Sequence, residues 1–187
     1  MDCRLDIELN QDHPAYLWAK KQSDSVNALG HIGTHLDCYT SSPEELYYDL
    51  ESVVFDCTHK MVELEDISSS DMEGKVVILF TNLLHSVGYG SKEYGEANTF
   101  LSEAVLEYIL SQKPKFILID ACGIGNHGDE HISFDKKCEA NNCYVIENIF
   151  LDKQIVENLE RIVIEISEHG SLTGKPCRLK ALLRDSK

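Results

Sequence analysis

The 187-residue sequence has no long apolar run that is free of charge. Its longest apolar stretches, such as Val76 to Phe80 and Phe116 to Ile119, fall far short of the roughly 20 residues that span a bilayer. Residues 1–9 alternate charged and apolar side chains, so they lack the apolar segment that a signal peptide needs. We therefore expect a soluble, cytoplasmic protein without a membrane partner.

Basic residues are also scarce. The sequence has 17 Lys and Arg residues against 32 Asp and Glu residues, which gives a formal net charge of -15. Proteins that bind nucleic acid need basic residues along the phosphates, so this composition argues against a nucleic-acid partner. The acidic surplus indicates mainly a solvated surface.

The seven cysteines include no C-x-x-C pair and are scattered along the sequence. Their odd number and their spacing argue against a structural zinc knuckle and against a regular disulfide framework. Buried, reduced thiols fit this pattern best, which agrees with a cytoplasmic location.

The hydrophobic pattern predicts an α/β fold. Runs of β-branched and aromatic residues predict buried strands at 52–57, 75–81, 115–120 and 144–149. Apolar residues spaced by three and four predict a helix from 101 to about 112. This order of strand, helix and strand is typical of parallel pairing within one sheet.

Other parts of the sequence are less regular. Residues up to about 45 are polar and broken by Pro14 and Gly30, so we expect loops and turns there after a first strand at 4–9. A short helix is expected at 133–141, after a glycine-rich loop. Because no repeat or linker divides the sequence, we expect a single domain over residues 1–187.

The segment from His31 to Asp37 is rich in metal-binding side chains. His31 and His35 offer imidazole nitrogens and Asp37 a carboxylate within seven residues. Gly33 argues against a helix here, and in an extended piece His35 and Asp37 would point to the same face. The spacing alone leaves two interpretations open, a metal site and a chance arrangement.

The amino-acid sequence of this segment, His-Ile-Gly-Thr-His-Leu-Asp, resembles the H-x-G-T-H-x-D signature of the cyclase family of metal-dependent hydrolases. That family includes bacterial kynurenine formamidases and isatin hydrolases. Five further segments of this sequence resemble family segments and follow in the same order, at 74–81, 101–104, 116–120, 145–148 and 174–178. The resemblance implies a swivelling β/α/β domain, with a mixed sheet flanked by helices, and a homodimer or homotetramer.

The resemblance also implies a set of metal ligands. The roles of the family's ligands carry over to His31, His35 and Asp37, and to Glu147 in the segment Val-Ile-Glu-Asn. The ion would be zinc or manganese, because a mixed nitrogen and oxygen set suits both, and one or two ions would bind. Without the resemblance, Glu147 would be interpreted as a solvent-facing carboxylate at a strand end.

Two departures from the family pattern indicate an atypical branch. The family's catalytic histidine is replaced by Ser41, a far weaker proton acceptor, which argues against a kynurenine formamidase. A further ligand histidine of the family is replaced by Asp135, which can still bind a divalent ion in a more oxygen-rich set. We therefore include Asp135 among the predicted ligands.

Residues 125–131 resemble a G-x-H-G-x-E-H segment of a less characterised branch of the family. His127 and His131 are therefore candidates to replace the missing proton shuttle, with His131 preferred as the general base. An exposed loop histidine is the alternative for each. Cys38 could act as a nucleophile, but nothing in the sequence supplies a base for it, and a role in the pocket wall is favoured.

These observations predict the hydrolysis of a small-molecule substrate, an amide, formamide, lactam or ester, by a metal-activated water. A second hypothesis is a relative that binds a metal or a small molecule without catalysis, because the usual catalytic histidine is missing. Turnover by a metal-loaded protein would distinguish the two.

Overall fold

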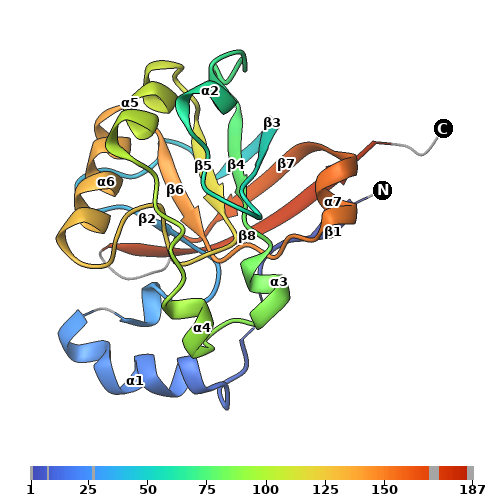
Figure 1. Cartoon of the computed structure of the whole chain (residues 1–187). Coiled ribbons are helices and arrows are strands. Elements are labelled where there is room, and N and C mark those ends of the chain that lie inside the picture. Colours follow the sequence, from blue (N-terminus) through green and yellow to red (C-terminus); the bar gives the residue numbers. More distant parts are fainter. Residues whose placement is uncertain (1, 8, 27, 169–172, 185–187) are drawn as a thin grey trace.

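A computed structural model of the chain describes residues 2–7, 9–26, 28–168 and 173–184 (Figure 1). The strands are β1 (Asp2–Arg4), β2 (His35–Asp37), β3 (Tyr47–Asp56), β4 (Val76–Phe80), β5 (Phe116–Ile119), β6 (Tyr144–Glu147), β7 (Leu159–Ile166) and β8 (Gly174–Leu183). The α-helices are α1 (Pro14–Val26), α2 (Leu64–Ile67), α3 (Leu83–Val87), α4 (Lys92–Gly95), α5 (Glu103–Ser111), α6 (Asp129–Ala140) and α7 (Lys153–Asn158). A 3-10 helix covers Ala28–Gly30.

The strands form one mixed sheet in the order β1-β8-β2-β6-β5-β4-β3-β7, and β7 pairs with β8 as well. That last pairing closes seven strands into a barrel, from which β1 branches at β8. The four strands β3, β4, β5 and β6 are parallel neighbours. The parallel pair β4 and β5 is the one that the order of strand, helix and strand predicted. The antiparallel pairs involve β2, β7 and β8.

The closed barrel corrects one expectation. A mixed α/β fold with helices against the sheet is confirmed, but the swivelling β/α/β arrangement does not describe this sheet. The physical reason lies in the two longest strands, each of which changes partners along its length. The first half of β3 pairs with β7 and the second half with β4, while β8 pairs first with β2 and then with β7. Each long strand therefore bends from one part of the sheet into the other.

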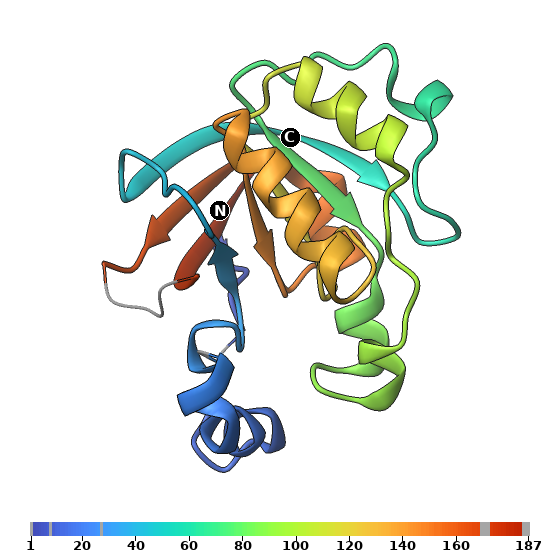
Figure 2. The ribbon, with the colours of Figure 1, turned by 90° about the vertical axis from the view of Figure 1, so that its left-hand side faces the viewer.

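Two hydrophobic cores lie on opposite faces of the parallel strands. Val76 and Ile78 belong to the core inside the barrel, while Val77 and Leu79 belong to the core beneath α5 and α6. Strands that are buried on both faces read as continuous apolar runs, which is why β4 and β5 were predictable. Figure 2 shows α6 lying across the outer face of the barrel, close to β6.

The first part of the chain differs from the prediction. The structure has a helix, α1, where loops were expected, and its β1 ends at Arg4 rather than extending to residue 9. Pro14 is at the first position of α1, where its missing N–H costs nothing. Leu17 and Trp18 are exposed, so α1 lacks the apolar stripe that identifies a helix. Helix α6 also begins at Asp129, earlier than predicted.

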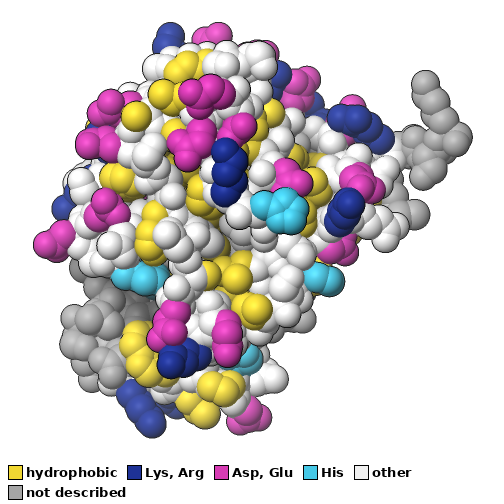
Figure 3. All heavy atoms as spheres, viewed as in Figure 1, with side chains coloured by type: hydrophobic (Ala, Val, Ile, Leu, Met, Phe, Trp, Pro, Cys, Tyr) yellow, Lys and Arg dark blue, Asp and Glu magenta, His cyan; other side chains and the backbone are white. Residues whose placement is uncertain are grey.

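Figures 1 and 2 show α1, α3 and α4 at the same end of the barrel. The residue before α1 meets the turn between α3 and α4, where the rings of His13 and Tyr89 lie 5.8 Å apart. In the described part of the chain, no helix has both the length and the apolarity to cross a membrane. Acidic side chains are spread over the face seen in Figure 3, with basic side chains between them.

Candidate metal centre

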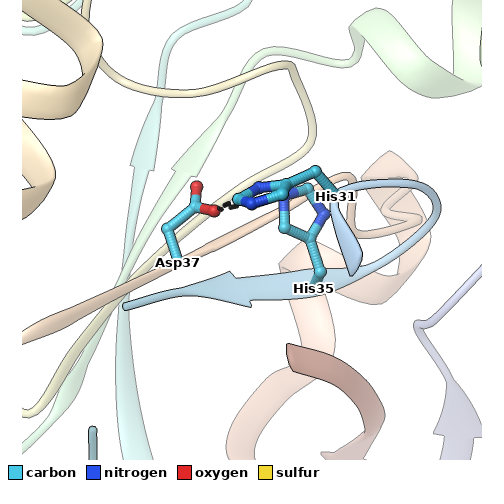
Figure 4. A group of neighbouring side chains, drawn as sticks. All are labelled: His31, His35 and Asp37. Carbon is cyan, nitrogen blue, oxygen red and sulfur yellow. Dashed lines mark ion pairs between the residues drawn. The ribbon is translucent and has the colours of Figure 1, made fainter. Parts of the chain in front are cut away.

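The predicted signature forms a turn followed by the short strand β2, which lies between β6 and β8 in the sheet. His35 and Asp37 point to the same face, because alternate residues of a strand share a face. Figure 4 shows both side chains beside His31, which approaches from the preceding turn. Nδ1 of His31 lies 2.8 Å from Oδ1 of Asp37, and its Nε2 lies 2.9 Å from Oγ1 of Thr173.

The orientation of His35 leaves one ring nitrogen available. Nδ1 lies 2.9 Å from the carbonyl oxygen of Gly33, so we assign the ring proton to this hydrogen bond. Nε2 then carries a free lone pair and faces two carboxylates, at 3.5 Å from Asp37 Oδ1 and 3.7 Å from Glu147 Oε2. A neutral imidazole with a fixed tautomer is the form that binds metal.

Asn148 and Tyr94 form hydrogen bonds that hold the Gly33 carbonyl, and thereby the His35 ring, in position. Nδ2 of Asn148 donates a hydrogen bond to the same Gly33 carbonyl at 3.0 Å, and the Tyr94 hydroxyl donates to Asn148 Oδ1 at 2.7 Å. Asn148 itself has a φ of 58°, in the left-handed region. The Thr34 hydroxyl donates to the Asn148 carbonyl at 2.7 Å, which fastens the turn to the end of β6.

Glu147 reaches the site through strand pairing. It is the residue directly opposite His35 in the antiparallel pair of β2 and β6. Its side chain is 5% exposed, so it does not face solvent as a carboxylate at a strand end usually does. The pairing of strands thus brings together residues that lie more than one hundred positions apart in the sequence.

Helix α6 supplies the other side of the site. His131 and Asp135 are one helical turn apart, and Nε2 of His131 lies 3.3 Å from Asp135 Oδ2. The same nitrogen lies 3.7 Å from Asp37 Oδ2 and 3.6 Å from Glu147 Oε1. The helix can come this close because Gly123 has no side chain. A Cβ at Gly123 would lie 2.5 Å from His131 Cε1 and 2.7 Å from Glu147 Oε1.

Among the described residues, two groups of side chains have the geometry to hold a metal ion, and they share one residue. Within each group the candidate ligand atoms lie within 4.8 Å of one another. The groups are His31, His35 and Asp37, and Asp37, His131 and Asp135. We name them the β2 group and the α6 group. Asp37 has two oxygens, so it can serve both groups at once.

Unpaired polar atoms are concentrated in this cluster. In the described residues, both oxygens of Asp37, both oxygens of Asp135 and Glu147 Oε1 are buried and accept no hydrogen bond of regular geometry. Their nearest polar neighbours include imidazole nitrogens of His31, His35 and His131, at 2.8 to 3.7 Å. A buried carboxylate oxygen without a partner is costly. Acceptors that face one another in this way fit a bound cation, which would give all of them a partner at once.

The electrostatics also indicate surplus negative charge. Burial and the neighbouring carboxylate of Asp37 raise the pKa of Asp135 to about 8, and the same two causes raise the pKa of Glu147 well above its usual value. Burial acts on Asp37 too, but the histidines around it outweigh burial and hold its pKa well below the usual range. A divalent cation would remove the repulsion that raises the two former values.

The other predicted residues lie outside the two groups. His127 is exposed, and its Nε2 lies 3.1 Å from the Gly95 carbonyl, although its ring stacks on that of His131. Ser41 is exposed, and its Oγ lies 3.3 Å from the Tyr144 hydroxyl. Burial raises the pKa of the Cys38 thiol, which works against a nucleophilic thiolate and agrees with a place in the wall.

Known proteins resemble this chain in sequence and in fold. A family model described as "Putative cyclase" matches residues 3–126, more than half of the chain. The chain belongs to the cyclase family. The matched region of this cyclase-family protein contains the whole β2 group and stops before α6 and Glu147. No curated protein matches the sequence.

Solved structures show the same fold. A potential metal-dependent hydrolase with cyclase activity aligns with a TM-score of 0.70 and 18% identity, over 100% of this chain and 99% of its own. Isatin hydrolase A from Labrenzia aggregata aligns with a TM-score of 0.73 and 14% identity, over 99% and 94%. A predicted metal-dependent hydrolase from Bacillus stearothermophilus aligns with a TM-score of 0.59 and 19% identity, over 96% and 86%.

Several residues of the site were not predicted. Tyr94 gave no signal, because a single tyrosine in a helix of four residues forms no recognisable sequence pattern. Asn148 was part of the family segment that contains Glu147, but its support of the Gly33 carbonyl depends on the turn folding back on β6. Gly123 was visible only as one of several glycines in a loop, and its role becomes clear only when His131 and Glu147 are placed beside it.

Proposed function

We propose that this protein is a metal-dependent hydrolase of a small amide, formamide, lactam or ester, and that it binds zinc or manganese. The observation that carries the proposal is the pair of ligand groups joined at Asp37, in which buried carboxylate oxygens face imidazole nitrogens and one another. A mixed set of imidazoles and carboxylates suits either metal. The fold shared with isatin hydrolase A and with metal-dependent hydrolases supports this proposal.

The candidate ligands divide between two ion sites. His31, His35 and Asp37 would hold one ion, and His131 and Asp135 would hold a second ion together with the other oxygen of Asp37. Glu147 lies beside both groups, within 3.7 Å of His35 and 3.6 Å of His131, and would be a further ligand. The chemistry that a bound divalent ion would supply is polarisation of the substrate carbonyl and a water molecule whose pKa is lowered from about 15.7 toward roughly 7.

Proton transfer falls to a carboxylate in this arrangement. His131 was the preferred general base from the sequence, but its Nε2 faces three carboxylates, which suits a ligand better than a free base. Asp135 has two buried oxygens, so one can bind the ion while the other accepts the proton. Asp135 thus takes over the task of the family histidine that Ser41 replaces.

The function is tested with protein loaded with zinc or with manganese and a panel of amides, formamides, lactams and esters. We expect hydrolysis of at least one class, loss of it on chelation, and loss of it in His35→Ala with the fold retained. Unchanged turnover in His35→Ala would contradict the proposal. A metal-replete protein that hydrolyses no member of the panel would favour the non-catalytic alternative, which the replacement of the catalytic histidine by Ser41 supports.

The homodimer or homotetramer and the cytoplasmic location stay predictions. Both derive from the sequence and its family resemblance, and neither enters the argument for the metal centre.

A further inference from the structure

Helix α6 carries a third acidic side chain in line with its two metal-binding residues. His131, Asp135 and Glu139 follow one another at intervals of four, so they lie along one face of the helix. Glu139 is 3% exposed, yet it belongs to neither ligand group. A buried carboxylate of this kind needs strong hydrogen bonds to offset its desolvation.

The Glu139 carboxylate receives these hydrogen bonds from the segment that follows Asp37. The backbone N–H of Tyr39 donates to Oε1. The backbone N–H groups of Thr40 and Ser41 donate to Oε2 at 2.8 and 3.1 Å, and the Thr40 hydroxyl donates to the same oxygen. Both carboxylate oxygens are therefore engaged by three consecutive residues.

A second contact joins the same two segments. Nζ of Lys136, on α6, lies 5.7 Å from the centre of the Tyr39 ring, within the range of a cation–π interaction. Helix α6 is thus attached to residues 39–41 at two neighbouring positions. These residues come directly after the one ligand that both metal groups share.

We propose that Glu139 is a positioning residue that ties α6 to the segment after Asp37 and so fixes the α6 group against the β2 group. This inference rests on the proposed metal centre and adds a residue to it. Without the tie, Asp37 would stay in its place in β2, but His131 and Asp135 could move away from it. Binding of the ion in the α6 group therefore depends on Glu139, whereas binding in the β2 group does not.

The experiment compares Glu139→Gln with the wild type by titrating metal-free protein with zinc and, separately, with manganese. Glutamine keeps the size of the side chain, but its NH2 group would face N–H donors of the loop. We expect the ion of the α6 group to bind about 10- to 100-fold less tightly, the usual effect of losing a residue that orients a ligand. The ion of the β2 group should bind as in the wild type, and the amides of residues 39–41 should exchange hydrogen faster.

The matched control is Glu107→Gln, the same chemical change on α5. Glu107 contacts α6 through Lys137 at 2.9 Å, but its side chain is 61% exposed and it accepts no hydrogen bond from residues 39–41. It should bind both ions like the wild type. Thr40→Val removes one of the four hydrogen bonds and should give a smaller loss in the same direction, which keeps the test usable where Glu139→Gln folds poorly.

The outcomes separate this inference from the proposed function. A Glu139→Gln protein that binds both ions as tightly as the wild type overturns the inference and leaves the metal centre standing. The same holds where only the thermal stability of the metal-free protein falls. A wild-type protein that binds neither ion overturns the metal centre, and the role of Glu139 with it.

Discussion

The two halves of the candidate centre are built by different means. The β2 group comes from seven consecutive residues, is hydrogen-bonded between two strands, and has its central histidine oriented by a backbone carbonyl. The α6 group depends on a helix that packs across the sheet, on Gly123 and on Glu139. One half is therefore contiguous in sequence and held within the sheet, the other is held by the packing of a helix, and of the ligands only Asp37 belongs to both groups.

The largest effect is expected at Asp37, the ligand that belongs to both groups. Asp37→Asn should weaken both ions, each by more than about 100-fold, because a structural zinc site contributes roughly 10–16 kcal/mol through about four ligands. His31→Ala is the matched control and should weaken only the ion of the β2 group. Metal titration followed by calorimetry measures both. An Asp37→Asn protein that still holds one ion tightly would show that the two groups are independent.

The α6 half can be disturbed alone at Gly123. In Gly123→Ala the new Cβ meets both His131 and Glu147, and the backbone has a φ of +95°, which alanine adopts at a cost. We expect the bound metal to fall from two ions to one, with about 10- to 100-fold weaker binding in the α6 group.

Gly95→Ala serves as the control for this change, since a Cβ there meets no atom within 4 Å. Metal content after dialysis, together with the circular dichroism spectrum, checks the result. Retention of two ions in Gly123→Ala would mean that the close approach of α6 is not needed.

A smaller effect is expected from pH, and it should have opposite signs with and without metal. Burial and Asp37 raise the pKa of Glu147 and of Asp135, the latter to about 8. Burial lowers the pKa of His35 and His131, but Asp37 outweighs it and raises both. Between about pH 5 and 8 the folded metal-free protein thus holds more protons than the unfolded chain, so its free energy of unfolding falls as pH rises.

Each proton that the folded protein holds in excess lowers the free energy of unfolding by about 1.4 kcal/mol per pH unit. With metal bound the carboxylates are held ionised, and the free energy of unfolding should rise over the same range, because binding releases protons. Urea denaturation from pH 5 to 8, with chelator or with metal, measures both slopes. Glu147→Gln should flatten the slope of the metal-free protein, and parallel curves with and without metal would contradict the explanation.

The difference between the β2 group and the α6 group also explains which parts of the centre could be predicted from the sequence. The residues of the β2 group lie within one sequence motif and could be predicted together. Buried strands such as β4 and β5 could be predicted because they are continuous apolar runs. His131, Asp135 and Glu147 could be named from the family pattern, and the structure does bring them together. His127 was named from the same pattern, but it lies outside the two groups. It precedes the first residue of α6, so the spacing of the helix does not place it on the face that carries His131 and Asp135.

The remainder needed the tertiary structure. Closure of the barrel depends on β3 and β8 changing partners midway, which no local pattern encodes. Helix α1 was missed because Leu17 and Trp18, which are exposed in the structure, do not belong to an apolar stripe in the sequence. Glu139 reads in the sequence like any acidic residue near the end of a helix, and only its hydrogen bonds to residues 39–41 reveal its importance.

The position of β2 in the barrel also sets the order in which the centre can be made. His35 pairs with Glu147 on one side and with Pro176 on the other. On the ribosome, the first ligands are synthesised early, but their strand has no neighbours until β6 and β8 have emerged. Such distant pairings are slow to form. A nascent chain therefore carries these histidines as unstructured ligands, and the centre is completed only when the last strand closes the barrel.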